Sequence, residues 1–405
     1  MREFPASPIT ALIDQAPRYN LGESVGADLT VAELLGPDGP EGAAGLAGVP
    51  LGYGTSTGDR ELRALVAARH GIPDGQVLIT SGAAAALFLV SLLCADGEVV
   101  LGQPGYPPTL SALRGIGAPV VTVRSRFEDG YRVDLDAFVG RLSPRTQLVS
   151  FASPQNPSGV PLTEDEVDQM LAAMARTCPE ALLLIDETFR EATYGPPPAA
   201  SFAGRSPRVL TCGSISKAYG APGLRIGWLT VPRPELYEQL RLARFNTALA
   251  CGSLDEFLAA RLLRRADEVL AARGAVLAEA RGIVERWVNG HRVVNGQRVV
   301  NGHRGVDGHR GVDGHRGVDG RGGRLGWLPP QAGAFCCLRL EPAAFGPREV
   351  DRFHSYLAEQ RVLVAPGPWF GDSAHVVRLG LAYEPPDRLE AGLEIIGAAL
   401  EATAR

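Results

Sequence analysis

Short apolar runs that alternate with helical patterns constrain the fold of this chain more than any other feature. Residues 146–151 are almost continuously apolar, and residues 181–185 and 209–211 form similar runs. Such runs are typical of strands that are buried on both faces of a parallel sheet. Because helical patterns separate them, the sequence predicts an α/β fold with a mostly parallel sheet and helices on both faces.

Other segments extend this alternation. The helix predicted at 163–176 begins with Thr163 followed by Glu166, a pair that can cap a helix N-terminus from both sides. The remaining predicted strands are 76–80, 98–101 and 119–123, and the remaining predicted helices are 59–68, 82–93 and 109–116. In such sheets ligands bind beyond the carboxyl ends of the strands, so motifs that directly follow a strand are candidate site residues.

The second half of the chain predicts a smaller α+β domain. Residues 235–245 and 254–287 are helical in pattern, and the second segment is long enough to bridge two domains. We therefore assign residues 46–252 to a large domain, and residues 253–405 with the N-terminal segment 1–45 to a small domain. Its predicted strands are 334–340 and 375–381, and its predicted helices are 348–359 and 387–403.

Composition excludes several classes of protein. The chain has 405 residues, 45% of them hydrophobic, so it can bury a large core. Its net charge of -5 makes nucleic acid an unlikely partner. Its longest apolar runs are too short to span a membrane, and residues 1–20 lack a signal-peptide pattern. Its 6 cysteines show no Cys-x-x-Cys spacing. We expect a cytoplasmic protein with reduced thiols.

A six-residue repeat over residues 289–320 interrupts this plan. Each unit starts with Asn-Gly or Asp-Gly, which form turns, and supplies too little apolar surface for a core. A β-helix would need a regular bulky apolar position. His291, His303, His309 and His315 allow a metal site in principle, but no rigid element fixes them, so we expect no metal and a solvated insertion that chemistry does not need.

Lys217 is the only lysine in the chain, although arginines are numerous. A primary amine can form an imine with an aldehyde, and a guanidinium cannot. Ser214 and Arg225 flank the lysine in a glycine-rich stretch and could hold a phosphate while the amine reaches an aldehyde on the same molecule. This pattern indicates pyridoxal phosphate (PLP); the alternative is a lone surface lysine.

Three further motifs follow predicted strands. Ser81-Gly82-Ala83-Ala84 opens a helix whose N–H groups could bind a phosphate, although such helix starts are common. Asn156 lies between two prolines, where it could bind a phenolate-like oxygen or simply form a turn. Asp186 ends a buried strand and could pair with a pyridinium N–H or cap a helix.

Two other side chains suit a ring and a carboxylate. Tyr106, in a Pro-Gly turn, could stack on a heteroaromatic ring or be a structural tyrosine. Arg378 lies inside an apolar strand and needs an anion, which a substrate carboxylate or an internal acid could supply.

Taken in order along residues 50–400, these motifs resemble the class I/II aminotransferases of PLP fold type I. The resemblance implies a large domain with a seven-stranded sheet, a smaller α+β domain, and a homodimer with shared active sites. The residues that carry it are Tyr53, Gly58, Leu62-Arg63, Ser81-Gly82, Tyr106, Asn156-Pro157-x-Gly159, Asp186, Ser214-x-x-Lys217, Arg225, Pro366-Gly367-x-x-Phe370 and Arg378.

The resemblance also implies a role for each residue. Lys217 would bind the cofactor covalently and move the substrate proton, and Arg378 would bind the substrate carboxylate. Asp186 would pair with the ring nitrogen. The other implied cofactor contacts are Asn156 to the 3′-oxygen, Tyr106 to the ring face, and Ser81, Gly82, Ala83, Ala84, Ser214, Arg225 and the partner subunit's Tyr53 to the phosphate.

One departure from the family pattern concerns the reaction. The family has a tyrosine three residues after the aspartate, where this chain has Phe189, which cannot donate a bond to the 3′-oxygen. Its loss should raise the basicity of that oxygen and of the lysine linkage. A phenylalanine here resembles antibiotic-pathway enzymes that do not transaminate, namely capreomycidine synthases and oxygen-dependent arginine oxidases. Glu23 could then meet a basic substrate side chain, or be a solvated loop residue.

The sequence thus favours a PLP enzyme acting on an L-amino acid, with transamination as the default. Elimination with cyclisation, or oxidation by dioxygen, is the alternative with the same cofactor. A regulator that has lost catalysis is disfavoured by the intact Lys217, Asp186 and Asn156, and a nicotinamide dehydrogenase by the lack of Gly-x-Gly-x-x-Gly after the first strand.

Overall fold

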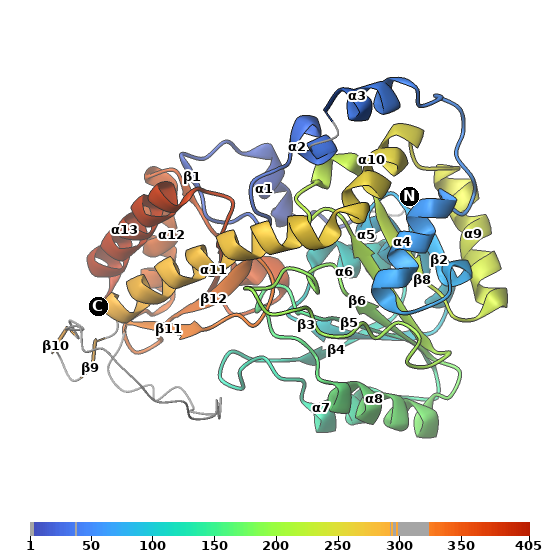
Figure 1. The fold of residues 1–405 in the computed structure, drawn as a ribbon. Coiled ribbons are helices and arrows are strands. Elements are labelled where there is room, and N and C mark those ends of the chain that lie inside the picture. Colours follow the sequence, from blue (N-terminus) through green and yellow to red (C-terminus); the bar gives the residue numbers. More distant parts are fainter. Residues whose placement is uncertain (1–3, 37–38, 292, 295–296, 299–323) are drawn as a thin grey trace, which may run out of the picture.

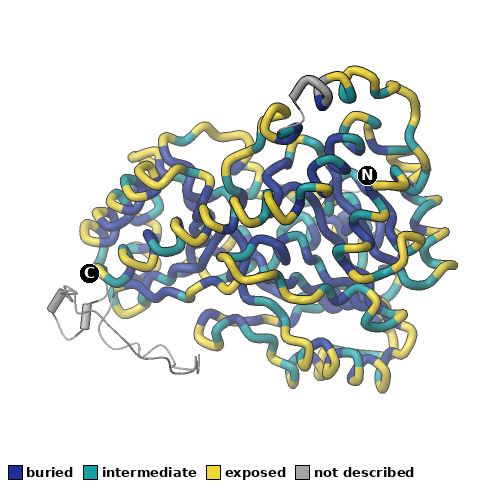
Figure 2. Tube along the Cα trace, in the orientation of Figure 1, coloured by how far each residue is buried: buried dark blue, intermediate teal, exposed yellow. Residues whose placement is uncertain are grey.

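The computed structural model describes residues 4–36, 39–291, 293–294, 297–298 and 324–405. Two sheets, each with its own helices, lie side by side and are linked by the long helix α11 (Ala266–His291), which runs between them (Figure 1). The strands form the buried interior, and the exposed surface is carried mainly by helices and loops (Figure 2).

The larger sheet has seven strands in the order β2-β8-β7-β6-β5-β3-β4. The pairs from β7 through β4 are parallel, and β8 runs antiparallel to both of its neighbours. Its strands are β2 (Val77–Thr80), β3 (Glu98–Gln103), β4 (Val120–Arg124), β5 (Thr146–Ala152), β6 (Leu182–Asp186), β7 (Val209–Ser214) and β8 (Gly227–Thr230).

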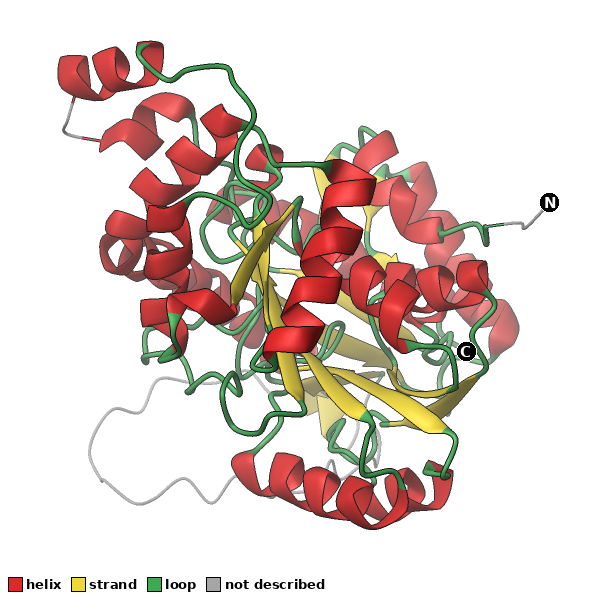
Figure 3. Cartoon of the chain, turned by 90° about the vertical axis from the view of Figure 1, so that its right-hand side faces the viewer, coloured by secondary structure: helices red, strands yellow, loops and turns green. Residues whose placement is uncertain are grey.

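Helices cover both faces of this sheet because its side chains alternate. In β6, Leu182 and Leu184 pack with α5 (Ala83–Cys94), α6 (Pro107–Ile116) and α9 (Pro234–Ala248), and Leu183 and Ile185 pack on the opposite face with α7 (Leu135–Arg141) and α8 (Glu164–Thr177). Figure 3 shows the strands enclosed between these layers. The β2 end is covered by α4 (Arg60–His70) and α10 (Ser253–Arg264).

The smaller sheet has four antiparallel strands in the order β11-β12-β15-β14, packed against α11, α12 (Pro347–Glu359) and α13 (Pro386–Thr403). Its strands are β11 (Leu325–Leu328), β12 (Phe335–Leu340), β14 (Ala365–Pro366) and β15 (Val376–Gly380). In the N-terminal segment, β1 (Tyr19–Asn20) pairs with β13 (Val362–Leu363), after α1 (Ala11–Asp14) and before α2 (Val31–Leu35) and α3 (Gly39–Ala47).

The mostly parallel seven-stranded sheet confirms the predicted fold class, with three differences in detail. The sequence patterns missed β8, β11 and β14, as well as the short β1–β13 pair. The predicted helix 254–287 is interrupted at Arg265, which separates α10 from α11. The first repeat unit begins as helix, since α11 continues through Asn289 and Gly290 to His291, and β9 (Val293–Val294) then pairs with β10 (Gln297–Arg298).

Most of the repeat, including His303, His309 and His315, lies outside the described residues. Within the described ranges, no helix is both long and apolar enough to cross a membrane, and no group of three or more His, Cys, Asp or Glu side chains could hold a metal ion.

Candidate active site

The predicted site residues lie where strands of the large sheet end. Asp186 and Ser214 are the last residues of β6 and β7, and Lys217 follows three residues after β7. Asn156 comes shortly after β5 and Tyr106 after β3. Because the carboxyl ends of parallel strands meet at one edge of a sheet, four separate motifs converge there.

Lys217 is held by the N-terminal segment. Its Nζ donates to Ser24 Oγ at 3.1 Å and to Glu23 Oε1 at 3.4 Å. Burial lowers the pKa of Lys217, the nearby Arg378 and Arg225 lower it further, and Glu23 opposes the shift. A lysine with a lowered pKa supplies more of the neutral amine that attacks an aldehyde.

Glu23 therefore lies in the site rather than in solvent. Burial raises the pKa of its carboxyl, but the charges of Lys217 and Arg378 and the N–H of Ser24 outweigh burial, so the net pKa is lowered. The carboxylate is thus negative and faces the amine.

Arg378 is fully buried on β15. Its Nη1 donates to Asn156 Oδ1 at 2.9 Å and its Nη2 donates to the carbonyl of Gly22 at 2.5 Å, whereas its buried Nε has no partner. Among the described residues, no carboxylate forms an ion pair with it, and burial lowers its pKa to about 10. A buried cation with an unused donor is suited to a carboxylate ligand.

The contact with Arg378 also orients Asn156. A guanidinium only donates hydrogen bonds, so the amide atom that faces it must be the oxygen. The amide NH₂ of Asn156 is therefore left to donate elsewhere, as required for a bond to a phenolate-like oxygen.

Asp186 is a buried carboxylate that lacks a cation. Burial raises its pKa, and bonds from Thr188 and Cys212 oppose the rise; the Thr188 N–H donates to Oδ1 at 2.9 Å. No Lys, Arg or His of the described chain pairs with this carboxyl. Tyr106, whose own pKa burial raises, is close enough to feel the charge of Asp186, and the two residues line one cleft.

The start of α5 forms a tight cradle for an anion. Gly82, with φ of 80°, caps the helix, and a Cβ added there would lie 2.6 Å from Arg225 Nη2. A Cβ on Gly227 would lie 2.6 Å from the nitrogen of Ala83. The two glycines let the guanidinium and the helix N-terminus approach each other, an arrangement that favours phosphate.

The remaining predicted residues differ in placement. Ser81 and Ala84 lie beside this cradle, and Ser214 is buried, where its Oγ accepts the N–H of Ser216 at 3.3 Å. Tyr53 is 91% exposed, so it is not among the residues brought together within one chain.

Phe189 lies beside the lysine. Its ring centroid is 5.9 Å from Lys217 Nζ, and the ring packs edge-on against Phe335. The residue is buried, and no hydroxyl occupies this place next to the amine.

Sequence patterns missed three contributors to the site: the hydroxyl of Ser24, the carbonyl of Gly22 and the N–H of Thr188. Two of them act through the backbone, which carries no sequence signal. Ser24 could have been suspected only from its position next to Glu23.

Comparison with known proteins agrees with this geometry. The family model described as aminotransferase class I and II matches residues 30–291. Capreomycidine synthase of Streptomyces vinaceus is 32% identical over 362 residues, which cover 87% of this chain and 82% of that protein. Arginine–pyruvate transaminase AruH of Pseudomonas aeruginosa is 32% identical over 192 residues, 44% of this chain and 48% of that protein.

A crystal structure of a PLP-dependent aminotransferase from Streptococcus suis superposes with a TM-score of 0.79 at 23% identity, covering 96% of this chain and 95% of that one. The fold is therefore that of the fold type I PLP enzymes. The chain belongs to the class I and II aminotransferase family, and its cofactor is pyridoxal phosphate.

The residues present fit this cofactor. Asp186 needs a cation, which a protonated ring nitrogen supplies, and the Gly82–Arg225 cradle needs an anion, which the phosphate supplies. Lys217 offers the amine that the aldehyde requires.

Proposed function

We propose that this enzyme is an L-amino-acid aminotransferase in which Lys217, Asp186 and Arg378 carry the reaction. The observation that carries the proposal is that consecutive residues of the N-terminal segment hold two cations: the Gly22 carbonyl accepts from Arg378, and the Glu23 carboxylate accepts from Lys217. A substrate carboxylate and its reacting amino group could therefore be bound side by side.

Each side chain has a separate task in this proposal. Arg378 binds the α-carboxylate through the unused Nε and so orients the Cα–H bond. The neutral amine of Lys217 would remove the proton from Cα and return it on the other side of the substrate nitrogen, two bonds away. Asp186 stabilises positive charge on the ring nitrogen, and the cofactor then supplies the electron sink for the carbanion. Asn156 donates to the ring oxygen, Tyr106 stacks on the ring, and the cradle with Ser214 holds the phosphate.

The proposed site is shared between two subunits of a homodimer. Tyr53 is exposed together with Leu51, and both line a shallow groove with Leu249 and Leu254. These apolar side chains suit burial by a second copy of the chain, which would bring Tyr53 to the partner's phosphate. The buried, unpaired cysteines suit a reducing compartment such as the cytoplasm.

The test is turnover with and without an amino acceptor. The PLP-loaded enzyme is incubated with single L-amino acids, with or without pyruvate or 2-oxoglutarate, and both the new keto acid and the new amino acid are measured. We expect equal amounts of both with acceptor, and no more than one keto acid per active site without it. Turnover that needs no acceptor would refute transamination.

A second candidate is favoured by Phe189. With Phe189 in place of the family's tyrosine, the 3′-oxygen loses one donor and the linkage to the cofactor is more basic, and the similarity to capreomycidine synthase extends over most of the chain. This candidate is an elimination with cyclisation, or an oxidation by dioxygen, of an arginine-like amino acid in an antibiotic pathway. Acceptor-free formation of a cyclic product, or consumption of dioxygen, distinguishes it.

Replacing Arg378 by lysine is expected to lower kcat/KM by about 10²-fold, because the buried charge pair loses the fixed direction in which the guanidinium Nε donates. The measurement is steady-state kinetics with an amino acid and with the corresponding amine that lacks the carboxylate. The rate with the amine should not change. Arg241→Lys, on the surface of α9, is the control, and an equal loss for both substrates would contradict the proposed role.

Replacing Glu23 by glutamine is expected to raise KM for amino acids with a basic side chain by about tenfold, because one buried charge contact is lost. When Lys217 binds the cofactor, its free ammonium group no longer faces Glu23, whose carboxylate can then accept a cation from a substrate. KM for neutral amino acids should stay within about twofold. Glu394→Gln, at an exposed position of α13, is the control. Equal changes for both substrate classes would show that Glu23 acts only on the lysine.

A further inference from the structure

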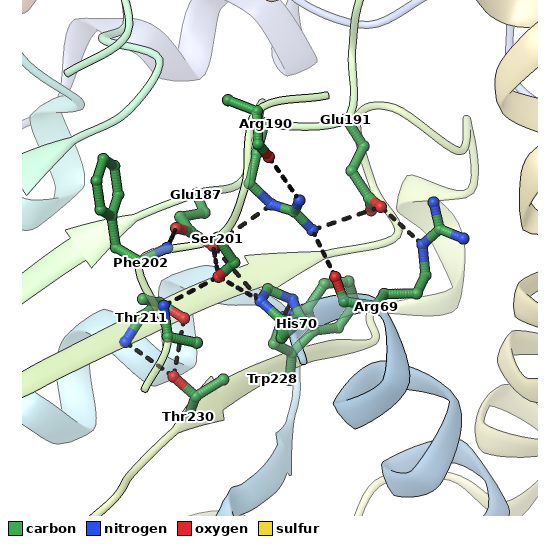
Figure 4. A network of polar contacts seen from close by, with 12 residues as sticks. Arg69, His70, Glu187, Arg190, Glu191, Ser201, Phe202, Thr211, Trp228 and Thr230 are labelled. Atoms are coloured by element: carbon green, nitrogen blue, oxygen red, sulfur yellow. Dashed lines mark hydrogen bonds and ion pairs between the residues drawn. The ribbon is translucent and has the colours of Figure 1, made fainter. Parts of the chain in front are cut away.

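A buried polar network begins in the chain that follows Asp186, around Glu187, Arg190 and Glu191 (Figure 4). The hydroxyl of Tyr219 joins it to the chain that follows Lys217. It lies on the far side of the strand end from the cofactor groups, because successive residues of a strand point to opposite faces of the sheet. Asp186 faces the cleft with Tyr106, and Glu187, the next residue, turns the other way into the protein. None of the proposed catalytic roles uses this network.

Glu187 anchors one end of the network. Its Oε2 accepts from Ser201 Oγ at 2.6 Å, and its Oε1 accepts from the N–H of Phe202 at 2.7 Å. Its own N–H donates to the carbonyl of Cys212 at 2.8 Å, on the neighbouring strand β7. The side chain is buried, so both carboxylate oxygens are fixed by the protein rather than by water.

His70 contacts Ser201, which bonds Glu187, and its hydrogen-bond partners define its tautomer. Trp228 Nε1 lies 3.0 Å from His70 Nε2, and an indole nitrogen can only donate, so Nε2 must accept. The proton is therefore on Nδ1, which donates to Ser201 Oγ at 2.7 Å. With the imidazole uncharged, the positive charge that balances Glu187 comes from Arg190, whose Nε is 3.5 Å from Oε2.

Arg190 carries the network onward to the lysine segment. Its Nη2 is 3.5 Å from Glu191 Oε1, which also accepts from Arg69 Nε at 2.7 Å. The other oxygen, Glu191 Oε2, accepts from the hydroxyl of Tyr219 at 2.6 Å. Burial, with the charge of Glu191, raises the pKa of Tyr219 well above its ordinary value, so the hydroxyl remains a donor.

Tyr219 is two residues after Lys217 and fully buried, in a turn closed by the bond from the Gly220 N–H to the Lys217 carbonyl. The chain of contacts thus runs from Glu187, next to Asp186, through Arg190 and Glu191 to this turn. The two negative charges of Glu187 and Glu191 are balanced by the positive charges of Arg190 and Arg69. Buried ion pairs of this kind fix the geometry of the chain more than they add to its stability.

This network links the segments that carry Lys217 and Asp186, the two residues proposed to bind opposite ends of a rigid cofactor. The aldehyde carbon and the ring nitrogen of PLP lie at opposite ends of one ring, so Lys217 and Asp186 must keep a fixed separation. We propose that the Glu187–Arg190–Glu191–Tyr219 network is a brace that sets this separation, and that Tyr219 and Glu191 are positioning residues for the reaction. This inference rests on the proposed roles of Lys217 and Asp186.

The test compares two tyrosine-to-phenylalanine variants. Tyr219→Phe removes the brace contact, and Tyr237→Phe removes a similar bond, from its hydroxyl to the Val77 carbonyl at 3.1 Å, far along the sheet. We measure the PLP dissociation constant of the cofactor-free protein, its thermal midpoint, and the pH at which the visible band of the lysine-bound cofactor changes. Glu191→Gln is a second brace variant and decides the outcome if Tyr219→Phe does not fold.

Both tyrosine variants should lower the thermal midpoint, and Tyr219→Phe by at least as much as Tyr237→Phe, because its lost bond goes to a charged acceptor. Only the brace variants should weaken PLP binding, by about tenfold, and move the midpoint pH of the band, since small misplacements far from the chemistry can cost up to about a hundredfold. The double variant Tyr219→Phe with Glu191→Gln should bind PLP no more weakly than the worse single variant.

Brace variants that match Tyr237→Phe in PLP binding and band midpoint would overturn the brace, since the network would then be structural only. The proposed function fails on a different result, namely a wild-type enzyme in which borohydride fixes no cofactor on Lys217.

Discussion

Replacing Lys217 by alanine is expected to lower turnover by at least about 10⁴-fold, because the chain then has no side-chain amine to move the proton at Cα. Lys217 is the only lysine of the sequence, so no neighbouring lysine can substitute for it. The measurement is the single-turnover rate with the best amino acid found in the acceptor assay. Borohydride reduction with peptide mapping should place the cofactor on Lys217 in the wild type and nowhere in the variant.

Two controls separate the chemistry from the fold. Lys217→Arg keeps a positive charge beside Glu23 but cannot form the linkage, so it should be as inactive as the alanine variant. A small amine such as methylamine, added to Lys217→Ala, should restore part of the rate by occupying the vacated space. A Lys217→Ala enzyme that retained more than about a hundredth of the wild-type rate would contradict the proposal, because general-base removal costs at least about that much.

The strands of the large sheet could be predicted because their sequence signal is local. Residues 146–151 are almost continuously apolar and residues 181–185 are entirely so, since both faces of β5 and β6 are covered. The capping pair at Thr163 and Glu166 likewise marks the start of α8 within the sequence itself, and both reciprocal bonds are present. Sequence signals of this kind depend only on neighbouring residues, so they can be recognised without knowledge of the tertiary structure.

Elements that depend on distant partners could not be predicted in the same way. The strand β8 is only four residues long and is stabilised by antiparallel pairing with β2 and β7. The break at Arg265 between α10 and α11 is set by packing, because neither proline nor glycine marks it.

The same division applies to the site. Asp186, Asn156 and Lys217 follow strands and could be found by position along the sequence. Glu23, which sequence alone also allows as a solvated loop residue, reaches Lys217 across 194 positions. No local pattern reports such a contact, and the bond from Arg378 to the carbonyl of Gly22 is equally invisible because it involves backbone.

Replacing Asp186 by asparagine is expected to lower turnover by about 10³-fold while making the cofactor-free protein more stable. In the proposed site, the loss of activity follows from removing the charge that would keep the ring nitrogen protonated, and removal of one such preorganised group typically costs about 10²–10³-fold. Asparagine preserves the shape and can still accept the N–H of Thr188, so local structure is retained. Turnover is measured in the PLP-loaded variant.

A cofactor methylated on the ring nitrogen provides the matching control. It carries a permanent positive charge, so it needs no carboxylate to remain cationic, and it should restore part of the activity of Asp186→Asn. If the variant loses activity for another reason, such as misfolding, the methylated cofactor should give no recovery.

The stability effect has a defined dependence on pH. Burial raises the pKa of Asp186 in the folded, cofactor-free protein, so folding favours the protonated carboxyl. Its contribution to stability is then fully present below the ordinary aspartate pKa of about 3.9 and is lost as the pH rises through the raised folded value. At neutral pH the folded protein therefore bears the cost of a carboxyl whose ionisation burial disfavours, and asparagine removes that cost.

We expect Asp186→Asn to raise the free energy of unfolding of the cofactor-free protein by about 1 kcal/mol at neutral pH, a gain of the size seen when a strained functional residue is relaxed. Urea titrations of both cofactor-free proteins should show this gain shrinking towards acidic pH, and PLP should reverse the order because only the wild type offers the ring nitrogen a counter-charge. A cofactor-free variant that is less stable than the wild type at neutral pH would show that Asp186 does not carry an uncompensated charge.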